Sequence, residues 1–313
     1  MSTLNKVQLI NKHGMTVTLC DFGARILSIQ VPSSKGELIE TTLNLQNDEE
    51  ILTDSAYMGA KCGRVANRIS NASFKLNGQT FLLEANEPNK TLHGGPKGIG
   101  LRTWHTSPVT SGEGYQEVTF NIHSENGDQG FPGNMDISCI FRLNDDNSLT
   151  QRFVATSDAD CPINICDHTY FTLGAEHLES LSLQVEADEY IPVDDQGIPS
   201  GQFLSVEGIM DFRKAKALVK VLPIKDYDEC YRLNAAKNKV ATLANNTTGL
   251  TLTISTDQPG LQVYTGNYLP QKHSAVALEA QGYPDAINQS AFKADIVTPD
   301  KPYARYVTYT FSS

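Results

Sequence analysis

The chain has 313 residues, and 25 Lys and Arg residues against 36 Asp and Glu residues give it a formal net charge of −11. This acidic balance argues against nucleic acid as a partner, because binding to the phosphate backbone requires clustered basic side chains. A hydrophobic content of 40% with 8% aromatic residues is typical of a globular protein and excludes a disordered chain.

The sequence carries no sign of a membrane or metal partner. No apolar run approaches the roughly 18 residues that a membrane helix needs, and polar residues such as Asn5, Lys6 and Asn11 interrupt the region where a secretory signal would lie. We therefore expect a cytoplasmic protein. The six cysteines are sparse and lack the paired CxxC spacing of a zinc site, which predicts reduced thiols and no bound metal.

Strand patterns follow one another along the whole chain. Apolar residues alternate with mostly polar neighbours, as half-buried strands require, in segments 118–122, 135–143, 181–185, 250–254 and 306–311. Asn77-Gly78 lies between two further strand segments at 74–76 and 80–82, and this dipeptide predicts a tight hairpin turn. Short helical turns are expected only at 54–59 and 284–288.

These patterns predict an all-β fold class, built as a large antiparallel β-sandwich of two packed sheets. We find no internal repeat, no low-complexity linker and no shift in composition along the chain. Residues 1–313 are therefore expected to form a single domain. A flat face of such a sandwich could pair two subunits, so a homodimer is also expected as an option.

Two of the seven histidines have neighbours that suit a ligand site. His93 lies in LHGGPKG, where two glycines let the backbone approach a ligand closely. His168 lies in CDHTYFTL, beside Asp167 and before the aromatic pair Tyr170-Phe171, which could form the wall of a pocket. A histidine that caps the loop is an equally good interpretation of His93, and His168 taken alone would more often be structural.

The segment GRVANRI holds two arginines, Arg64 and Arg68, among small and apolar residues. A guanidinium group in such surroundings needs acceptors, and its planar fork of donors suits a carboxylate or the vicinal hydroxyls of a polyol. Arg68 together with Asn67 could therefore hold a sugar. A structural salt bridge is an alternative that is at least as good.

Two carboxylates stand in apolar or aromatic surroundings. Asp228 lies in YDECY, and Glu279 follows the apolar run SAVAL. A carboxylate at the end of a buried strand is costly unless it is paired, hydrogen-bonded or held with a raised pKa. Glu279 is therefore the best candidate for a general base, with a buried ion pair as the alternative. The alternative for Asp228 is a pair with Arg64, Arg68 or Arg232.

Taken together and in order, these segments resemble the aldose 1-epimerase (galactose mutarotase) family nearly from end to end. The blocks that carry the resemblance are GRVANRI, LHGGPKG followed by Trp104, GFPGN, DHTYF, YDECY, LQVYTGNYL and LEAQGYPDAIN. The resemblance implies a large β-sandwich and an enzyme that interconverts the α and β anomers of free hexoses such as galactose and glucose. It implies no cofactor.

The resemblance also implies roles for individual residues. Glu279 would be the general base and His168 the general acid that together open and reclose the hemiacetal ring. The residues expected around the sugar are Asn67, Arg68, His93, Asp228 and Gln262.

Three positions depart from the family pattern. Asp167 stands where many members have asparagine, and it would add a negative charge next to the proposed acid. Glu229 stands where histidine is frequent, and Thr172 where asparagine is frequent. These departures leave the preferred sugar open, because neighbouring polar contacts decide which hydroxyl pattern is accepted.

Other functions remain open alternatives. A glycosidase would use Asp228 and Glu279 as a carboxylate pair, but it would leave His168 without a role. An epimerase of maltose or of a hexose 6-phosphate is closer, although a basic cluster for phosphate is absent beyond RKAK at 213–216. A non-catalytic carbohydrate-binding β-sandwich would bind the same sugars without moving a proton.

Overall fold

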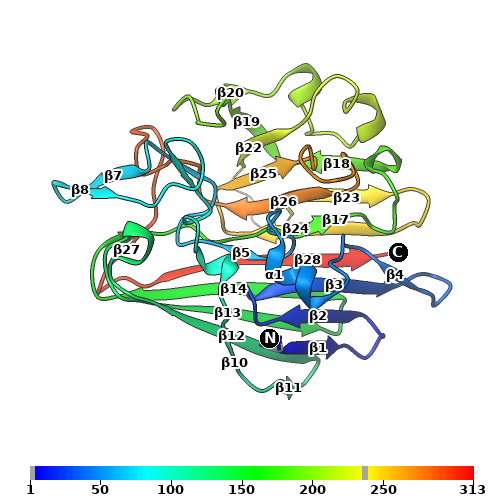
Figure 1. Ribbon diagram of the computed structural model, residues 1–313. Coiled ribbons are helices and arrows are strands. Elements are labelled where there is room, and N and C mark those ends of the chain that lie inside the picture. The colour runs from blue at the N-terminus through cyan, green and yellow to red at the C-terminus, as the bar shows by residue number, and fades with distance from the viewer. Residues whose placement is uncertain (1–3, 235–238) are drawn as a thin grey trace.

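The computed structural model describes residues 4–234 and 239–313, and in these residues antiparallel β-sheets dominate (Figure 1). The all-β class predicted from the alternating patterns is therefore confirmed. No helix in this part of the chain has both the length and the apolar character needed to cross a membrane.

The α-helix of the described residues, α1 (Asp48–Thr53), lies just before the segment where a helical turn was predicted. Asn47 caps it, because the Asn47 side chain accepts a hydrogen bond of 3.0 Å from the backbone N–H of Glu50. Residues 54–59 form bends and turns instead, so that prediction was displaced by six residues. Residues 284–288 form turns, as expected.

The largest sheet has ten strands and contains most of the strands predicted from the sequence. In spatial order its strands are β10 (His105–Thr106), β12 (Tyr115–Ser124), β13 (Met135–Asn144), β14 (Ser148–Ser157), β28 (Tyr303–Ser312), β24 (Thr251–Thr256), β23 (Ala241–Asn245), β18 (Leu181–Val185) and β21 (Lys216–Ala217), with β11 (Thr110–Gly112) on β12. All five alternating segments that predicted half-buried strands lie in this sheet.

A six-stranded sheet packs on the first and carries much of the candidate site. Its order is β17 (Tyr170–Phe171), β26 (Val276–Gln281), β25 (Gly260–Tyr264), β22 (Asp228–Leu233), β19 (Ala187–Ile191) and β20 (Leu204–Ser205). The rings of Phe171 and Tyr309, one from each sheet, are 5.0 Å apart. Phe171 therefore belongs to the core between the sheets. The sequence analysis had allowed that it could form the wall of a pocket.

Smaller sheets complete the molecule. The strands at the amino end are β1 (Lys6–Ile10), β2 (Thr16–Cys20), β3 (Arg25–Pro32) and β4 (Leu38–Glu40). The two-stranded pairs are β5 (Lys61–Cys62) with β16 (Cys166–Asp167), β6 (Arg68–Ser70) with β9 (Lys90–Leu92), β7 (Ser73–Leu76) with β8 (Gln79–Leu82), and β15 (Cys161–Pro162) with β27 (Ile296–Val297). The 3-10 helices are Ile99–Leu101, Asp128–Gly130, Leu178–Ser180, Gly208–Met210 and Leu218–Lys220.

The hairpin of β7 and β8 confirms the turn predicted at Asn77-Gly78. Both residues have positive φ, 51° for Asn77 and 78° for Gly78, as a tight two-residue turn between antiparallel strands requires. The six cysteines are free thiols, as expected, and all of them are buried.

A buried ion pair joins β5 to β16, directly beside His168. The Lys61 ammonium contacts the Asp167 carboxylate, and the two side chains are 0% and 1% exposed. The Tyr309 hydroxyl donates to the other oxygen of Asp167 at 2.8 Å. The negative charge that Asp167 adds beside the proposed acid is therefore balanced within the core.

We predict that Asp167→Asn destabilises the protein by about 3–5 kcal/mol, because it leaves the Lys61 charge buried without its partner. Chemical denaturation monitored by fluorescence measures this change. The matched control is the neutral double variant Lys61→Met/Asp167→Asn, which should recover most of the loss. A single variant within about 1 kcal/mol of the parent would show that water or another group compensates Lys61.

Candidate active site

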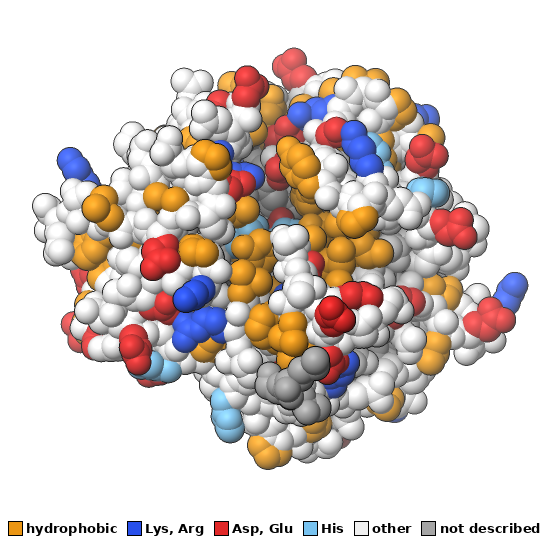
Figure 2. All heavy atoms as spheres, viewed as in Figure 1, with side chains coloured by type: hydrophobic (Ala, Val, Ile, Leu, Met, Phe, Trp, Pro, Cys, Tyr) orange, Lys and Arg blue, Asp and Glu red, His pale blue; other side chains and the backbone are white. Residues whose placement is uncertain are grey.

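A cavity of about 310 Å³ opens on the face seen in Figure 2, where apolar, acidic and histidine side chains surround a hollow. Its size suits a small molecule. Six of the seven residues predicted for the site line it: Asn67, Arg68, His93, His168, Asp228 and Glu279. The seventh, Gln262, is not among the lining residues.

Strand register explains how distant segments meet at this cavity. Glu279 on β26 is paired with Gln262 on β25, and Gln262 is paired in turn with Cys230 on β22. Asp228 lies two residues before Cys230, so it presents its side chain on the same face of the sheet. The six-stranded sheet thus aligns Glu279, Gln262 and Asp228 across neighbouring strands.

Glu279 and His168 face each other in the wall of the cavity. His168 Nε2 lies 3.6 Å from Glu279 Oε1, and the side chains are 7% and 3% exposed. Burial raises the pKa of Glu279 above its ordinary value, although the nearby His168 favours the charged form. A buried carboxylate of raised basicity next to an imidazole is suited to moving protons.

The sequence analysis had assumed that Glu279 lies at the end of its strand, but the structure shows that it does not. It lies in the interior of β26, where all six residues are buried. Both faces of this strand are covered, so the alternation that marks half-buried strands is missing. The cost of placing a carboxylate there is reduced by its contacts, including a hydrogen bond of 3.1 Å from the Cys166 thiol to Glu279 Oε2.

Aromatic rings surround His168. Its ring centroid lies 4.9 Å from that of Tyr170, 6.3 Å from Tyr57 and 6.4 Å from Tyr264. In the part of the chain that the structure describes, His168 Nδ1 has no hydrogen-bond partner. Packing therefore holds the ring, and Nε2 is the nitrogen that faces Glu279.

His93 is a neutral hydrogen-bonding group of the cavity wall. Burial, and then the neighbouring His168 and Arg68, lower the pKa of His93 well below its ordinary value. The backbone N–H of Asn67 donates to His93 Nδ1 at 3.2 Å, which leaves the ring hydrogen on Nε2. His93 can therefore donate a hydrogen bond without carrying a charge.

The packing of the protein itself requires the two glycines beside His93. Gly94 has a φ of +85°, and a Cβ at this position would lie 1.9 Å from the carbonyl oxygen of Gly63. A Cβ on Gly95 would lie 2.9 Å from the Gln129 side chain. Only glycine lets this loop pack against its neighbours closely enough to hold His93 in place.

Arg68 lines the cavity, and it also forms the salt bridge that the alternative interpretation predicted. Its Nε donates to Glu87 at 2.8 Å and its Nη2 at 3.1 Å. This two-pronged contact fixes the plane of the guanidinium group. Arg64, in contrast, is structural: it is buried and donates to the backbone carbonyls of Ser124, Glu125 and other residues.

Asp228 is held by Gln262 and not by an arginine. Gln262 Nε2 donates to Asp228 Oδ1 at 2.7 Å. Burial raises the pKa of Asp228, and the Gln262 amide counteracts this effect. Gln262 therefore orients Asp228 without lining the cavity, whereas the sequence analysis placed Gln262 around the ligand. Arg232 pairs with Glu189 instead, at 2.7 Å.

The lining residues that the sequence analysis missed include Tyr57, Glu87, Tyr264 and Tyr268. Tyr268 is 86% exposed, which is unusual for so large an aromatic side chain. Tyr264 belongs to LQVYTGNYL, which contributed to the family resemblance, so that block was a usable signal. Nothing near Glu87 in the sequence indicates that it reaches Arg68.

The two remaining departures from the family pattern also lie outside the cavity lining. Glu229 is buried and pairs with Lys225 at 2.5 Å. Thr172 is buried, and its hydroxyl accepts a hydrogen bond of 3.3 Å from the Gly174 N–H. The sequence analysis linked these two positions to the choice of sugar, and neither side chain lines the cavity.

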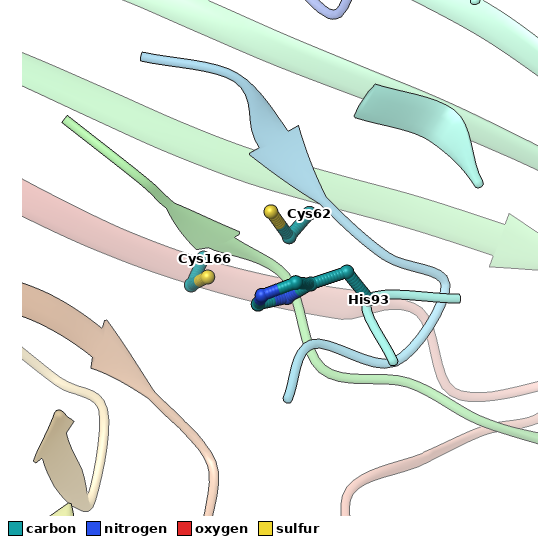
Figure 3. Close-up of side chains that lie close together, drawn as sticks. All are labelled: Cys62, His93 and Cys166. Atoms are coloured by element: carbon teal, nitrogen blue, oxygen red, sulfur yellow. The ribbon is translucent and has the colours of Figure 1, made fainter. Parts of the chain in front are cut away.

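Cys62, His93 and Cys166 converge from three separate segments, with candidate ligand atoms within 4.8 Å of one another (Figure 3). Spacing in the sequence gave no sign of this cluster. Burial raises the pKa of both thiols, and the hydrogen bond from Asn67 leaves the His93 hydrogen on Nε2. A metal ion bound by these three side chains would have to displace the two thiol hydrogens and the Nε2 hydrogen of His93.

The fold and the cavity define a β-sandwich protein with a buried carboxylate and an imidazole arranged for acid–base chemistry. The model of the aldose 1-epimerase family matches residues 5–310. The chain belongs to the aldose 1-epimerase family.

Relatives match over nearly the full length. The chain is 39% identical to the aldose 1-epimerase of Haemophilus influenzae, over 90% of this chain and 87% of the relative. It is 35% identical to the Escherichia coli aldose 1-epimerase, over 97% and 94% of the two chains. The human galactose mutarotase is 31% identical over 99% and 94%.

Solved structures give the same fold. An aldose epimerase homologue from C. elegans superimposes with a TM-score of 0.93 at 28% identity, covering 99% of each chain. A galactose 1-epimerase from Lactobacillus acidophilus superimposes with a TM-score of 0.90 at 27% identity, covering 99% of this chain and 95% of that one. The predicted β-sandwich and the family resemblance are thus confirmed.

Proposed function

We propose that this protein is an aldose 1-epimerase that interconverts the α and β anomers of free hexoses, with galactose and glucose as substrates. One observation carries the proposal: Glu279 Oε1 and His168 Nε2 lie 3.6 Å apart in the wall of an open cavity. The anomeric hydroxyl oxygen and the ring oxygen of a pyranose are bonded to the same carbon. Two groups this close can therefore each contact one of those oxygens.

In the proposed reaction, Glu279 takes the proton of the anomeric hydroxyl while His168 gives a proton to the ring oxygen. The bond between the anomeric carbon and the ring oxygen breaks, and the sugar opens to its aldehyde. Rotation about the bond between C1 and C2 presents the other face of the carbonyl. Reclosure reverses both proton transfers and yields the opposite anomer. The steps involve no redox change and require no cofactor.

The other residues of the cavity bind and orient the sugar in this proposal. Arg68, whose plane is fixed by Glu87, donates to sugar hydroxyls, and the neutral His93 donates from Nε2. Asn67 and Asp228 anchor further hydroxyls. Gln262 acts through Asp228, to which it donates at 2.7 Å. Relatives named galactose mutarotase support galactose as a substrate.

Polarimetry on freshly dissolved α-galactose, α-glucose, maltose and xylose tests the proposal. We expect the protein to accelerate the drift of optical rotation of galactose and glucose well above the spontaneous rate. Sugar binding without acceleration would indicate a non-catalytic carbohydrate-binding protein. Release of a new reducing end from a glycoside would indicate hydrolysis, and a marked preference for maltose would move the substrate to disaccharides.

Substitution of the two proton-transfer groups should abolish most turnover. We expect Glu279→Gln and His168→Gln each to lower kcat by about 10²–10⁴-fold, because each removes one positioned proton transfer. Arg68→Ala is the matched control, and its main effect should be a higher KM. Circular dichroism checks that all three variants are folded. If Glu279→Gln stays nearly as fast as the parent, the base lies elsewhere, with Asp228 the next candidate.

The dependence of the rate on pH should be bell-shaped. Activity falls on the acid side when Glu279 becomes protonated, and burial raises the pKa of Glu279 above its ordinary value of 4.5. The midpoint of the acid limb should therefore lie above 4.5. The proposal assigns the alkaline limb to the group that must give a proton to the ring oxygen. After subtraction of the spontaneous rate, a flat profile from about pH 5 to about pH 8 would contradict the assignment.

A further inference from the structure

The two oxygens of the Glu279 carboxylate have different surroundings. Oε1 is 3.6 Å from His168 Nε2, at the cavity. Oε2 accepts a hydrogen bond of 3.1 Å from Cys166 Sγ, and both residues are buried. One oxygen is therefore free for a ligand, while the other is held by a neighbouring strand.

We propose that Cys166 is a positioning residue for Glu279, because its thiol holds Oε2 and thereby directs Oε1 toward His168 and the bound sugar. This inference rests on the proposed function and adds to it a residue that does not line the cavity. Cys166 acts through Glu279 and does not touch the sugar.

The Cys166 thiol stays protonated in this position and can therefore keep donating its hydrogen bond. Burial raises the pKa of Cys166 well above its ordinary value, and the neighbouring Cys62 and Glu279 act in the same direction. The thiol therefore keeps its hydrogen across the range in which the enzyme would work. A thiol is a weak donor, but it suits a carboxylate that must later accept a proton.

The position of Cys166 couples the base to the acid. Cys166 lies two residues before His168, so the same short segment contacts Oε2 of Glu279 and carries the imidazole that faces Oε1. Two contacts fix this segment in turn. Cys166 lies opposite Cys62 in the antiparallel strands β16 and β5, and the Asp167 carboxylate forms an ion pair with Lys61. Movement of either group relative to the other is thus restricted.

The titratable groups that interact electrostatically with Glu279 come from several strands. Besides Cys166 they are Cys62 on β5, Asp167 on β16, His168, Tyr170 on β17, Asp228 and Cys230 on β22, Tyr264 on β25 and Tyr309 on β28. Of these groups, His168 and the Cys166 thiol favour the charged carboxylate. Loss of the thiol therefore leaves the proton more tightly bound to Glu279.

The test compares Cys166→Ala and Cys166→Val, which lack the donor, with Cys166→Ser, which keeps one. Cys20→Ala is the matched control, since Cys20 is another buried thiol, in a separate apolar cluster around Leu27 and Ile51. Initial rates on galactose are measured by polarimetry over a pH series, with kcat and KM separated at each pH. Thermal unfolding checks that each variant is folded.

We expect the donorless variants to shift the acid limb upward by about one pH unit, which corresponds to a tenfold change in the ionisation constant. Their plateau kcat should fall about 10-fold with KM nearly unchanged, because even a small displacement of a reacting group is costly. Cys166→Ser should restore both values toward the parent, and Cys20→Ala should leave them unchanged.

Two results would overturn the inference: donorless variants with the parent's acid limb and kcat, or equal losses in Cys166→Ser and Cys166→Ala. The second result would assign packing, and not the hydrogen bond, to Cys166. Ionisation of Glu279 followed by NMR with labelled glutamate keeps the test independent of turnover. If the parent itself fails to accelerate mutarotation, the proposed function falls, while an unshifted Glu279 titration in Cys166→Ala still refutes the hydrogen bond's role.

Discussion

The site depends on one constraint, the burial of the Glu279 carboxylate inside a β-strand. A charge in apolar surroundings is costly, and here the cost is reduced by contacts to both oxygens, from Cys166 on one and His168 on the other. The remaining cost appears as a raised pKa of Glu279, which makes the carboxylate a better proton acceptor. A site on strands of a packed sheet is also held more rigidly than a site on loops. The burial that makes Glu279 a better proton acceptor thus also lowers the stability of the folded protein.

The segment 166–168 connects the core to the site through the simple alternation of an extended chain. Cys166 and His168 both contact Glu279, whereas the side chain of Asp167 between them contacts Lys61 and Tyr309 in the core. Asp167 therefore fixes the segment in the core from one side, while Cys166 and His168 contact Glu279 from the other. This arrangement also explains how a charged residue can stand next to His168 without placing an unbalanced charge in the cavity.

Much of the fold could be predicted from the sequence, because its signals are local. Alternating segments became strands of the ten-stranded sheet, and Asn77-Gly78 became the turn of a hairpin. Of the site, the residue identities came from the ordered blocks that resemble the family. A strand that is buried on both faces has no alternation of apolar and polar residues. The apolar residues before Glu279 therefore did not indicate that it lies in the middle of β26.

The contacts that hold the site residues in place could not be predicted. Lys61 and Asp167 are 106 residues apart, Cys166 and Glu279 are 113 apart, and no local preference of the chain indicates either contact. The pair of Arg68 with Glu87 and the hydrogen bond from Gln262 to Asp228 arise in the same way, from the packing of strands and loops. These contacts decide how the site residues are held, which their identities alone do not.

The central claim is that Glu279 and His168 act on two different oxygens of one hemiacetal. A crystal structure of the Glu279→Gln variant with galactose bound tests it most directly, since the sugar would be trapped without rapid turnover. The account predicts that residue 279 contacts the anomeric oxygen while His168 Nε2 contacts the ring oxygen, each within about 2.6–3.2 Å. A sugar bound with both groups on the same oxygen, or with the ring oxygen turned away from His168, would contradict it.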